Sequence, residues 1–348
     1  MTNQIFLGDC LDLLSRMDDS SVDLVVTSPP YNLGKEYEGK VKLDRYISTQ
    51  AGVIEQCVRV LKSTGSIFWQ VGSFSDKGVL IPLDIRFFPV FESFNMIPRN
   101  RIAWIRQHGL HGRNKFSPRY ETVLWFTKSD NYKFNLDDVR VPQKYKNKKY
   151  HTGSKKGKLS CNPDGKNPGD IWAFRNVKHN HEEQTLHPCQ FPEDMVARMI
   201  LSTTDEGDLV FDPYMGAGTV AVVSQNLNRK YMGAEMRDDY FNIATRRLDG
   251  KPDANGCFPN LKTLRDYAES NDQDVSQFSF DVQRGKKPTD RTKAKIHPES
   301  HHLDELYKRT QYEEEAFSAA LDGREAPEDY FKGGKVRQTE PNLFDPAS

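Results

Sequence analysis

The sequence contains no apolar run that approaches the length of a membrane-spanning helix. Its first residues also lack a basic stretch followed by a long apolar core, which is the pattern of a secretory signal peptide. Neither of the usual signals of a membrane or exported protein is therefore present. We expect a soluble protein of the cytoplasm.

Cysteine is scarce and scattered. The 348 residues include five cysteines, which are widely spaced and form no CxxC pair. This argues against a disulfide framework and for a reduced, intracellular protein. A metal site is not expected either, because the neighbouring His and Cys residues fit no standard zinc-finger spacing. Those residues are His179, His181, His187 and Cys189.

A net charge is also absent, since 49 Lys and Arg residues balance 49 Asp and Glu residues. The distribution of charge is more informative. Residues 140–158 hold eight Lys or Arg residues and no Asp or Glu, with Tyr145 and Tyr150 among them. A solvated loop is the ordinary interpretation, and phosphate contact with DNA is the one that we favour. The DNA-binding candidates are Lys144, Lys146, Lys148, Lys149, Lys155 and Lys156.

Apolar residues are concentrated in two separate parts of the chain. We predict a catalytic domain formed by residues 1–132 and 186–250, with an insertion at 133–185 between them. Residues 251–348 are predicted to be a polar C-terminal extension that is partly disordered.

Strand and helix patterns alternate within the two apolar parts. Short β-branched apolar runs predict strands, and apolar residues at helical spacing predict helices. The predicted strands are 4–7, 22–27, 66–71, 86–91, 101–105, 121–127, 208–211 and 231–235, and the predicted helices are 10–16, 49–61, 191–201, 218–226, 238–247 and 303–321. This alternation predicts an α/β fold with a mainly parallel sheet flanked by helices.

A loop with two glycines joins a predicted strand to a predicted helix. The segment LVFDPYMGAGT covers residues 209–219. Gly216 and Gly218 would let the backbone approach a ligand, and the helix N-terminus supplies unpaired N–H groups. Glu235 ends the next strand, 17 residues after Gly218 (235 − 218), where a carboxylate can accept from both ribose hydroxyls. The pattern predicts a nucleoside-like cofactor, although an ordinary tight turn or a dinucleotide loop would also fit it.

The stretch VVTSPPYNLG, residues 25–34, ends a buried strand abruptly. Its two consecutive prolines remove two backbone donors and fix two φ angles. Pro29 also forces Ser28 to be extended. Taken alone, the stretch predicts only a rigid turn at the end of a strand.

Taken together, the two segments resemble motifs of the DNA amino-methyltransferases. TSPPY (residues 27–31) resembles the catalytic motif of that family, and FDPxxGxGT (residues 211–219) resembles its S-adenosylmethionine loop. The order, with the catalytic motif first, resembles the β group of the family. Gly8-Asp9 fits the acidic position that contacts adenine, and HPxQxP, which begins at His187, resembles the segment that closes over the methionine end.

This resemblance implies a Rossmann-like fold with circularly permuted motif order, S-adenosyl-L-methionine as cofactor and double-stranded DNA as partner. It implies a restriction–modification setting, places the target-recognition region in the insertion, and leaves open a homodimer and a companion restriction endonuclease. The implied catalytic residues are Ser28, Pro29, Pro30 and Tyr31. The implied cofactor-binding residues are Asp9, His187, Phe211, Asp212, Gly216, Gly218, Thr219 and Glu235.

The amine of a nucleobase is a poor nucleophile, because its lone pair is delocalised into the ring. Two acceptors on its hydrogens, the Ser28 hydroxyl and the rigidly placed Pro29 carbonyl, would localise that lone pair. Tyr31 would stack on a base that has been flipped out of the duplex. In the family, Ser in this position usually accompanies cytosine N4, which we favour. Asn32 is common among the adenine N6 enzymes, which remain the alternative.

Three other functions are weighed against this interpretation. Pro188-Cys189 suggests attack on cytosine C5, but in that family the cofactor loop precedes the Pro-Cys pair, whereas here it follows. An NAD-linked oxidoreductase normally places its glycine loop after the first strand, and nothing in it requires a Ser-Pro-Pro-Tyr corner. A catalytically silent DNA-binding module remains the third alternative.

Overall fold

An eight-stranded sheet forms the centre of the protein in the computed structural model, which describes residues 3–34, 39–106, 112–143, 145, 147–178, 181–273, 275–281 and 301–322. In spatial order the strands are β1 (Gln4–Leu7), β10 (Lys230–Glu235), β9 (Leu209–Asp212), β2 (Val22–Thr27), β3 (Leu61–Val71), β7 (Tyr120–Thr127), β6 (Ile97–Ile105) and β8 (Ile171–Trp172). The first five are parallel, and β7 is antiparallel to β3 and β6. The predicted mixed, mostly parallel sheet is confirmed.

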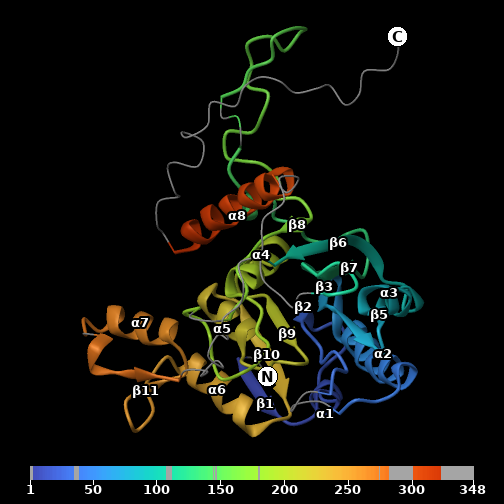
Figure 1. The fold of residues 1–348 in the computed structure, drawn as a ribbon, viewed down its shortest axis with the longest axis vertical. Coiled ribbons are helices and arrows are strands. Elements are labelled where there is room, and N and C mark those ends of the chain that lie inside the picture. Colours follow the sequence, from blue (N-terminus) through green and yellow to red (C-terminus); the bar gives the residue numbers. More distant parts are fainter. Residues whose placement is uncertain are drawn as a thin grey trace.

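Helices cover both faces of the sheet (Figure 1). One face packs against α1 (Cys10–Leu14), α2 (Leu43–Val60) and α3 (Leu83–Ser93). The other face packs against α4 (Glu193–Thr203), α5 (Thr219–Asn226) and α8 (His301–Leu321), and α6 (Asp238–Asp249) lies beside α5. The predicted flanking helices are therefore confirmed on both faces.

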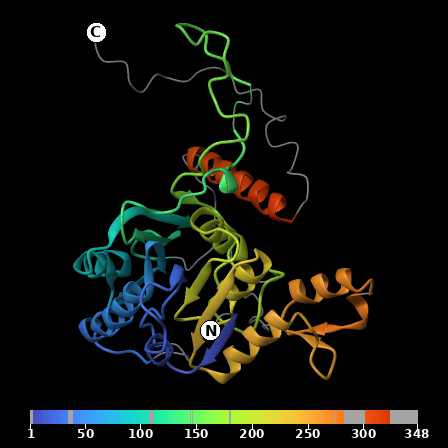
Figure 2. The same ribbon diagram turned by 180° about the vertical axis from the view of Figure 1, so that it is seen from behind.

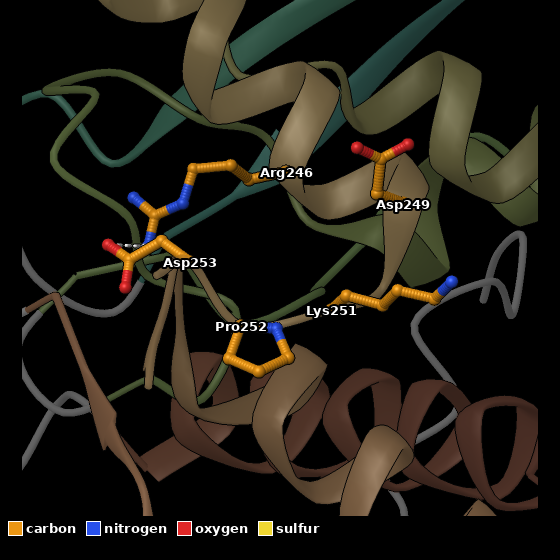
Figure 3. Close-up of a pocket in the computed structure, with 5 residues that line it drawn as sticks. All are labelled: Arg246, Asp249, Lys251, Pro252 and Asp253. Carbon is orange, nitrogen blue, oxygen red and sulfur yellow. Dashed lines mark ion pairs between the residues drawn. The ribbon is translucent and has the colours of Figure 1, made fainter. Parts of the chain in front are cut away.

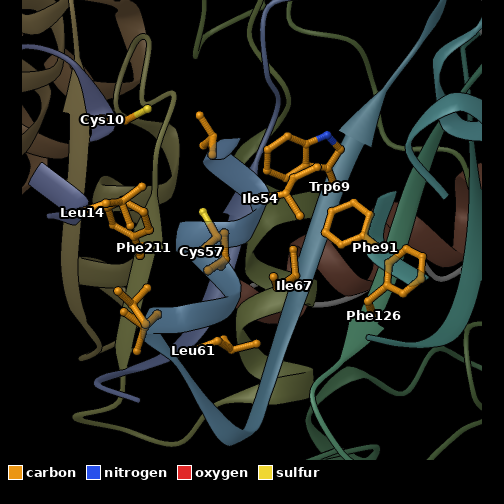
Figure 4. Close-up of a cluster of buried hydrophobic side chains, with 14 of the residues drawn as sticks. Cys10, Leu14, Ile54, Cys57, Leu61, Ile67, Trp69, Phe91, Phe126 and Phe211 are labelled. Atoms are coloured by element: carbon orange, nitrogen blue, oxygen red, sulfur yellow. The ribbon is translucent and has the colours of Figure 1, made fainter. Parts of the chain in front are cut away.

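The larger core lies between the sheet and α2 and α3 (Figure 4). Trp69 on β3 is fully buried and meets Phe91 edge-on, with ring centroids 5.7 Å apart. Phe91 in turn stacks on Phe126 of β7 at 4.5 Å. Burying each such side chain contributes about 1.5–3 kcal/mol, so this cluster holds α3 against β3 and β7.

The prediction of a strand at residues 86–91 is wrong, because α3 occupies this segment. The local composition suggests a strand, since aromatic and branched residues lie on both sides of Pro89. The burial is nevertheless helical: Leu83, Phe87 and Phe91 recur every four residues and are fully buried, whereas Ile85 is 58% exposed. Tertiary packing thus overrides the local propensity here.

Several predicted boundaries also shift. The helix predicted at 49–61 begins earlier, at Leu43, and β3 begins at Leu61 rather than at residue 66. A short hairpin that was not predicted, β4 (Ser73–Asp76) and β5 (Val79–Pro82), follows β3. It connects β3 to α3 without adding to the main sheet.

Residues 141–166 form a long arm that projects away from the sheet (Figures 1 and 2). Backbone bridges pair Val141 with Lys166 and Lys149 with Leu159, so the arm runs out and returns along itself. The last part of the predicted insertion belongs to the main sheet, because β8 pairs with β6. Trp172 of β8 is buried in the core on the face of the sheet that α4 and α5 cover. The arm is therefore the part of residues 133–185 that stands apart from the sheet.

The segment that follows α6 contains folded elements. Strands β11 (Cys257–Phe258) and β12 (Ser279–Phe280) pair with each other. Helix α7 (Leu261–Ser270) lies between them in the sequence and contacts both strands. Figure 1 shows this unit at the side of the molecule, away from α8. The predicted helix at 303–321 is confirmed as α8. The rest of the predicted disorder falls at residues 282–300 and 323–348, outside the described residues.

Candidate active site

The carboxyl ends of five parallel strands meet at one edge of the sheet. From β9 the chain continues to β10 on one side, whereas from β2 it continues to β3 on the other. A reversal of this kind leaves a crevice in which open α/β sheets bind their ligands. The cofactor-loop candidates follow β9, and the Ser-Pro-Pro-Tyr corner follows β2, so both motifs lie at this reversal.

One buried hydrogen bond joins the two motifs. The Thr27 hydroxyl, at the end of β2, donates to Asp212 Oδ1 at 2.6 Å, across 185 residues of sequence. The Tyr214 backbone N–H donates to the same oxygen at 3.0 Å. The other oxygen, Asp212 Oδ2, is buried and has no hydrogen-bond partner among the described residues. An orphaned carboxylate oxygen at this position fits a polar group of a bound ligand.

Burial raises the pKa of Asp212 from 3.8 to about 7, the hydrogen bonds from Thr27 and Tyr214 oppose this rise, and the Glu235 charge adds to it. The folded state then binds more protons than the unfolded chain between about pH 4 and pH 7. The contribution of Asp212 to stability therefore falls as the pH rises through this window.

Replacing Asp212 by Asn keeps the Oδ1 acceptor for Thr27 and removes the titration. We expect Asp212→Asn to gain stability relative to the unaltered protein by roughly 1.4 kcal/mol for each pH unit from pH 5 to about pH 7, with little further change up to pH 8. Urea unfolding of both proteins at each pH measures this difference. Parallel stability curves would show that Asp212 does not titrate as described.

The two loop glycines serve different neighbours. Both have positive φ angles, 54° at Gly216 and 77° at Gly218. A Cβ on Gly218 would lie 2.7 Å from the Ala244 Cβ of α6, so this glycine is required by helix packing. A Cβ on Gly216 would lie 3.0 Å from His187 Nε2, so here the glycine lets His187 lie against the loop. Sequence reasoning, which assigned both glycines to close ligand approach, misses the contact with α6.

Glu235 holds the loop from the neighbouring strand. Its carboxylate accepts from the backbone N–H groups of Gly216 and Arg237, each at 2.9 Å. Burial is the main cause that raises its pKa. Asp9 lies beside it, because Gly8 N–H donates to the Glu235 carbonyl, and Asp9 itself is exposed and caps α1.

Of the remaining cofactor candidates, His187 contacts the glycine loop, whereas Phe211 and Thr219 are buried behind it. His187 is half-buried and meets the Tyr240 ring edge-on at 4.3 Å. Phe211 is fully buried in the core (Figure 4), and Thr219 is buried at the start of α5, where its hydroxyl accepts from Arg247 at 3.1 Å. The side chains of Phe211 and Thr219 therefore shape the loop from behind.

The Ser-Pro-Pro-Tyr corner is anchored on its far side. The Tyr46 hydroxyl of α2 donates to the Pro30 carbonyl at 2.5 Å. Asn32, at φ 60°, exchanges two hydrogen bonds of 2.8 Å with the Val41 backbone. Among the described residues, no backbone N–H donates to the Pro29 carbonyl, and Ser28 is half-buried at the crevice. The two groups expected to accept from a substrate amine thus stand on a fixed support.

Tyr31 takes part in a polar network that sequence reasoning missed. Its hydroxyl donates to Gln70 Oε1 at 2.8 Å and lies 3.4 Å from Ser28 Oγ. Gln70 also donates to Glu121, which forms an ion pair with Arg106 at 2.9 Å. The only sequence signal for this network is a polar residue at the end of an apolar strand, and β7 brings Glu121 to that place only through antiparallel pairing.

A cavity of about 490 Å³ lies elsewhere, between α6 and the segment that follows it (Figure 3). It is lined by Arg246, Asp249, Lys251, Pro252 and Asp253. The lining residues lie at the C-terminal end of α6 and directly after it, and none of them is a candidate cofactor-binding or catalytic residue.

The basic candidates that the structure describes all lie on the projecting arm. Lys148, Lys149, Lys155 and Lys156 are exposed, and Lys144 and Lys146 lie outside the described residues. The Lys148 ammonium lies 5.9 Å from the ring centroid of Tyr145, which is 60% exposed. The arm thus presents cations and an aromatic face together.

Within the described ranges, no cluster of three or more His, Cys, Asp or Glu side chains could hold a metal ion. Of the histidines and cysteine weighed for zinc, His179 lies outside the described residues, and Cys189 is exposed. No helix in the described part of the chain is long and apolar enough to cross a membrane.

Comparison with known proteins places the chain in a family. The sequence model of the N6_N4_Mtase family, described as DNA methylase, matches residues 22–246. The chain belongs to this DNA methylase family. The match includes the Ser-Pro-Pro-Tyr corner and the glycine loop. DNA methylases of this family depend on S-adenosyl-L-methionine, which agrees with the cofactor expected from the sequence.

Individual relatives of this DNA methylase agree with the assignment. Type II methyltransferase M.BglII of Bacillus subtilis is 57% identical over 90% of this chain and 87% of its own. DNA adenine methyltransferase YhdJ of Escherichia coli is 32% identical over 70% of this chain and 82% of its own. Among solved structures, PvuII DNA methyltransferase, described as cytosine-N4-specific, has a TM-score of 0.57 at 22% identity, covering 80% of this chain and 94% of its own. That structural likeness confirms the predicted methyltransferase fold.

Proposed function

We propose that this DNA methyltransferase transfers a methyl group from S-adenosyl-L-methionine to N4 of a cytosine within a specific DNA site, as part of a restriction–modification system. The observation that carries the proposal is the Thr27–Asp212 hydrogen bond of 2.6 Å. It holds the corner that would receive the base next to the loop that would receive the cofactor. Positioning two reactants side by side is the main task in this chemistry.

The cofactor would lie along the loop between β9 and α5. The bound sulfonium supplies an electrophilic methyl group, and the chain's own residues supply position. Glu235 and Asp9 lie at adjacent strand ends, where they would hold the ribose and the adenine. Asp212 and His187 would contact the remaining part of the cofactor. Asp212 lies on the side of the loop that faces Thr27, and His187 lies against Gly216.

The base would enter beside Ser28. The Ser28 hydroxyl and the Pro29 carbonyl would accept from the two amine hydrogens, so the nitrogen lone pair points at the methyl group. The Tyr31 ring is held at its hydroxyl by Gln70 and would stack on the flipped base. This arrangement needs no general base before methyl transfer, because acceptors alone localise the lone pair.

Two observations favour cytosine over adenine. Ser28 offers a neutral hydroxyl in the position that adenine enzymes of the resembling family usually fill with Asp or Asn. Asn32, the feature that favoured adenine, is only 3% exposed and bonds to the Val41 backbone, so it has a structural role. Adenine N6 remains the second candidate, since a relative at 32% identity is a DNA adenine methyltransferase.

The arm would contact DNA phosphates next to the flipped base. We expect combined Ala substitutions at its four described lysines to weaken duplex binding roughly tenfold or more near 0.1 M salt, and to reduce the salt dependence by about 0.9 per lost phosphate contact. Lys230 and Lys251, which are exposed elsewhere, give a matched control when replaced together. Anisotropy titrations of a duplex over a range of salt concentrations measure both quantities, and an unchanged salt slope would exclude the arm from phosphate contact.

Two measurements test the proposed function itself. Calorimetric titration should show binding of S-adenosyl-L-methionine and no binding of NAD. Transfer of labelled methyl groups from that cofactor to unmodified genomic DNA should follow. Binding of NAD alone would favour an oxidoreductase, and cofactor binding without transfer to any DNA would favour a silent DNA-binding module.

A further inference from the structure

The polar network behind Tyr31 starts from a charge that can only accept hydrogen bonds. Glu121 lies at the start of β7, and its Oε1 forms an ion pair with Arg106 Nη1 at 2.9 Å. Both side chains are mostly buried, with exposed fractions of 15% and 19%. In this ion pair Glu121 is the acceptor, and a carboxylate has no hydrogen to donate.

This charge fixes the orientation of the Gln70 amide. The Gln70 Nε2 group donates to Glu121 Oε2 at 2.5 Å, and turning the amide over would bring two oxygens together. Gln70 is 3% exposed, so water does not compete for it. The amide oxygen, Oε1, is therefore held toward the Tyr31 hydroxyl at 2.8 Å.

The Tyr31 hydroxyl then points its hydrogen toward Gln70 and Glu121. Its neighbours on this side are Gln70 Oε1 and, at 3.3 Å, Glu121 Oε2, and both are acceptors. Burial raises the pKa of Tyr31 well above its ordinary value, with a further contribution from the Glu121 charge, so the hydroxyl keeps its proton. That proton faces Gln70 or Glu121, and the lone pairs of Tyr31 are left for Ser28.

We propose that Glu121, acting through Gln70 and Tyr31, is a positioning residue that keeps the Ser28 oxygen an acceptor for the target amine. Because the Tyr31 hydrogen is directed at Gln70 or Glu121, Ser28 is the donor in the contact of 3.4 Å between the two hydroxyl groups. The Ser28 lone pairs then face the crevice. This inference rests on the proposed function, and it adds the direction of the hydrogen bonds that the proposed chemistry requires.

The variant Glu121→Gln tests this direction with little change of shape. A Gln side chain can donate, which allows the Gln70 amide to turn over and donate to Tyr31, and the chain of hydrogen bonds reverses toward Ser28. We expect kcat for DNA methylation to fall roughly tenfold or more. The Ser28 hydroxyl hydrogen would then point at the hydrogens of the target amine, and Ser28 could no longer accept from them. The affinity for S-adenosyl-L-methionine and the KM for DNA should stay within about twofold.

A double-mutant cycle separates this role from simple support of the fold. Tyr31→Phe removes the hydroxyl that links Gln70 to Ser28 while it keeps the stacking ring. In the Tyr31→Phe background, Glu121→Gln should have almost no further effect on kcat. Additive losses would overturn the proposal, because they would mean that Glu121 acts without Tyr31.

Failure of this inference can be told apart from failure of the proposed function. If the unaltered protein transfers no methyl group to DNA, the proposed function itself is wrong. If it is active and Glu121→Gln is equally active, only the hydrogen-bond direction is wrong. If Glu121→Gln does not fold, Tyr31→Phe alone decides: kcat should fall several-fold at unchanged cofactor affinity, and an unchanged kcat would overturn the proposal.

Discussion

Ser28→Ala is expected to lower the methylation rate by about 100-fold or more while the affinity for S-adenosyl-L-methionine changes less than about twofold. The reason is that Ser28 follows the end of β2, on the base side of the crevice, whereas the cofactor candidates Asp212 and Glu235 are the last residues of β9 and β10. Losing one preorganised hydrogen-bonding group at a reacting centre typically costs a factor of 10² to 10³ in rate.

Single-turnover methylation and calorimetric cofactor titration measure the two quantities separately. Ser21→Ala is a matched control, since Ser21 precedes the same strand at its opposite end, where its hydroxyl donates to the Asp18 carbonyl. It should leave both quantities unchanged. An equal loss of rate and cofactor affinity in Ser28→Ala would refute the assigned role of Ser28.

Glu314→Ala is expected to destabilise the protein by about 3–5 kcal/mol, the usual cost of leaving one partner of a buried ion pair alone. Glu314 on α8 pairs with Arg198 Nη1 of α4 at 2.9 Å. Arg198 is 1% exposed and lies against Phe174 and Phe317, with its guanidinium carbon 4.6 and 4.4 Å from their ring centroids. Without Glu314 the guanidinium loses the carboxylate that balances its charge in this apolar setting.

Glu55, an exposed residue of α2, provides the control, and Glu55→Ala should change stability by no more than about 0.5 kcal/mol. Urea unfolding of the three proteins gives the comparison. Equal stability of Glu314→Ala and the unaltered protein would show that α8 does not rest on this ion pair. The preceding residue, Glu313, forms an ion pair of 2.7 Å with Lys166 at the base of the arm, so α8 also contacts the arm.

The sequence was sufficient to predict the sheet edge that carries both motifs. The apolar run before Ser28 and the run before Gly216 are each short, β-branched and closed by a turn signal, so each had to be a buried strand. The order of the two motifs, rather than either motif alone, pointed to the family. Both arguments depend on local sequence, and local sequence determines where these strands end.

What the sequence could not show depends on contacts between distant segments. The local sequence around Phe87 and Phe91 predicts a strand. Their packing against Trp69, which is distant in sequence, favours a helix instead. Glu121 gives no sign of its role, because only antiparallel pairing of β7 with β3 brings it beside Gln70. Likewise the spacing from Arg198 to Glu314 carries no local pattern that would predict their ion pair.

The most direct test of the account is the identity of the methylated base. Unmodified DNA is treated with the protein and S-adenosyl-L-methionine, digested to nucleosides, and separated by chromatography with mass detection. The account predicts N4-methyldeoxycytidine as the product, and its loss when Ser28→Ala replaces the unaltered protein. N6-methyldeoxyadenosine would contradict the assignment of the base, and the absence of any methylated nucleoside would contradict methyl transfer to DNA.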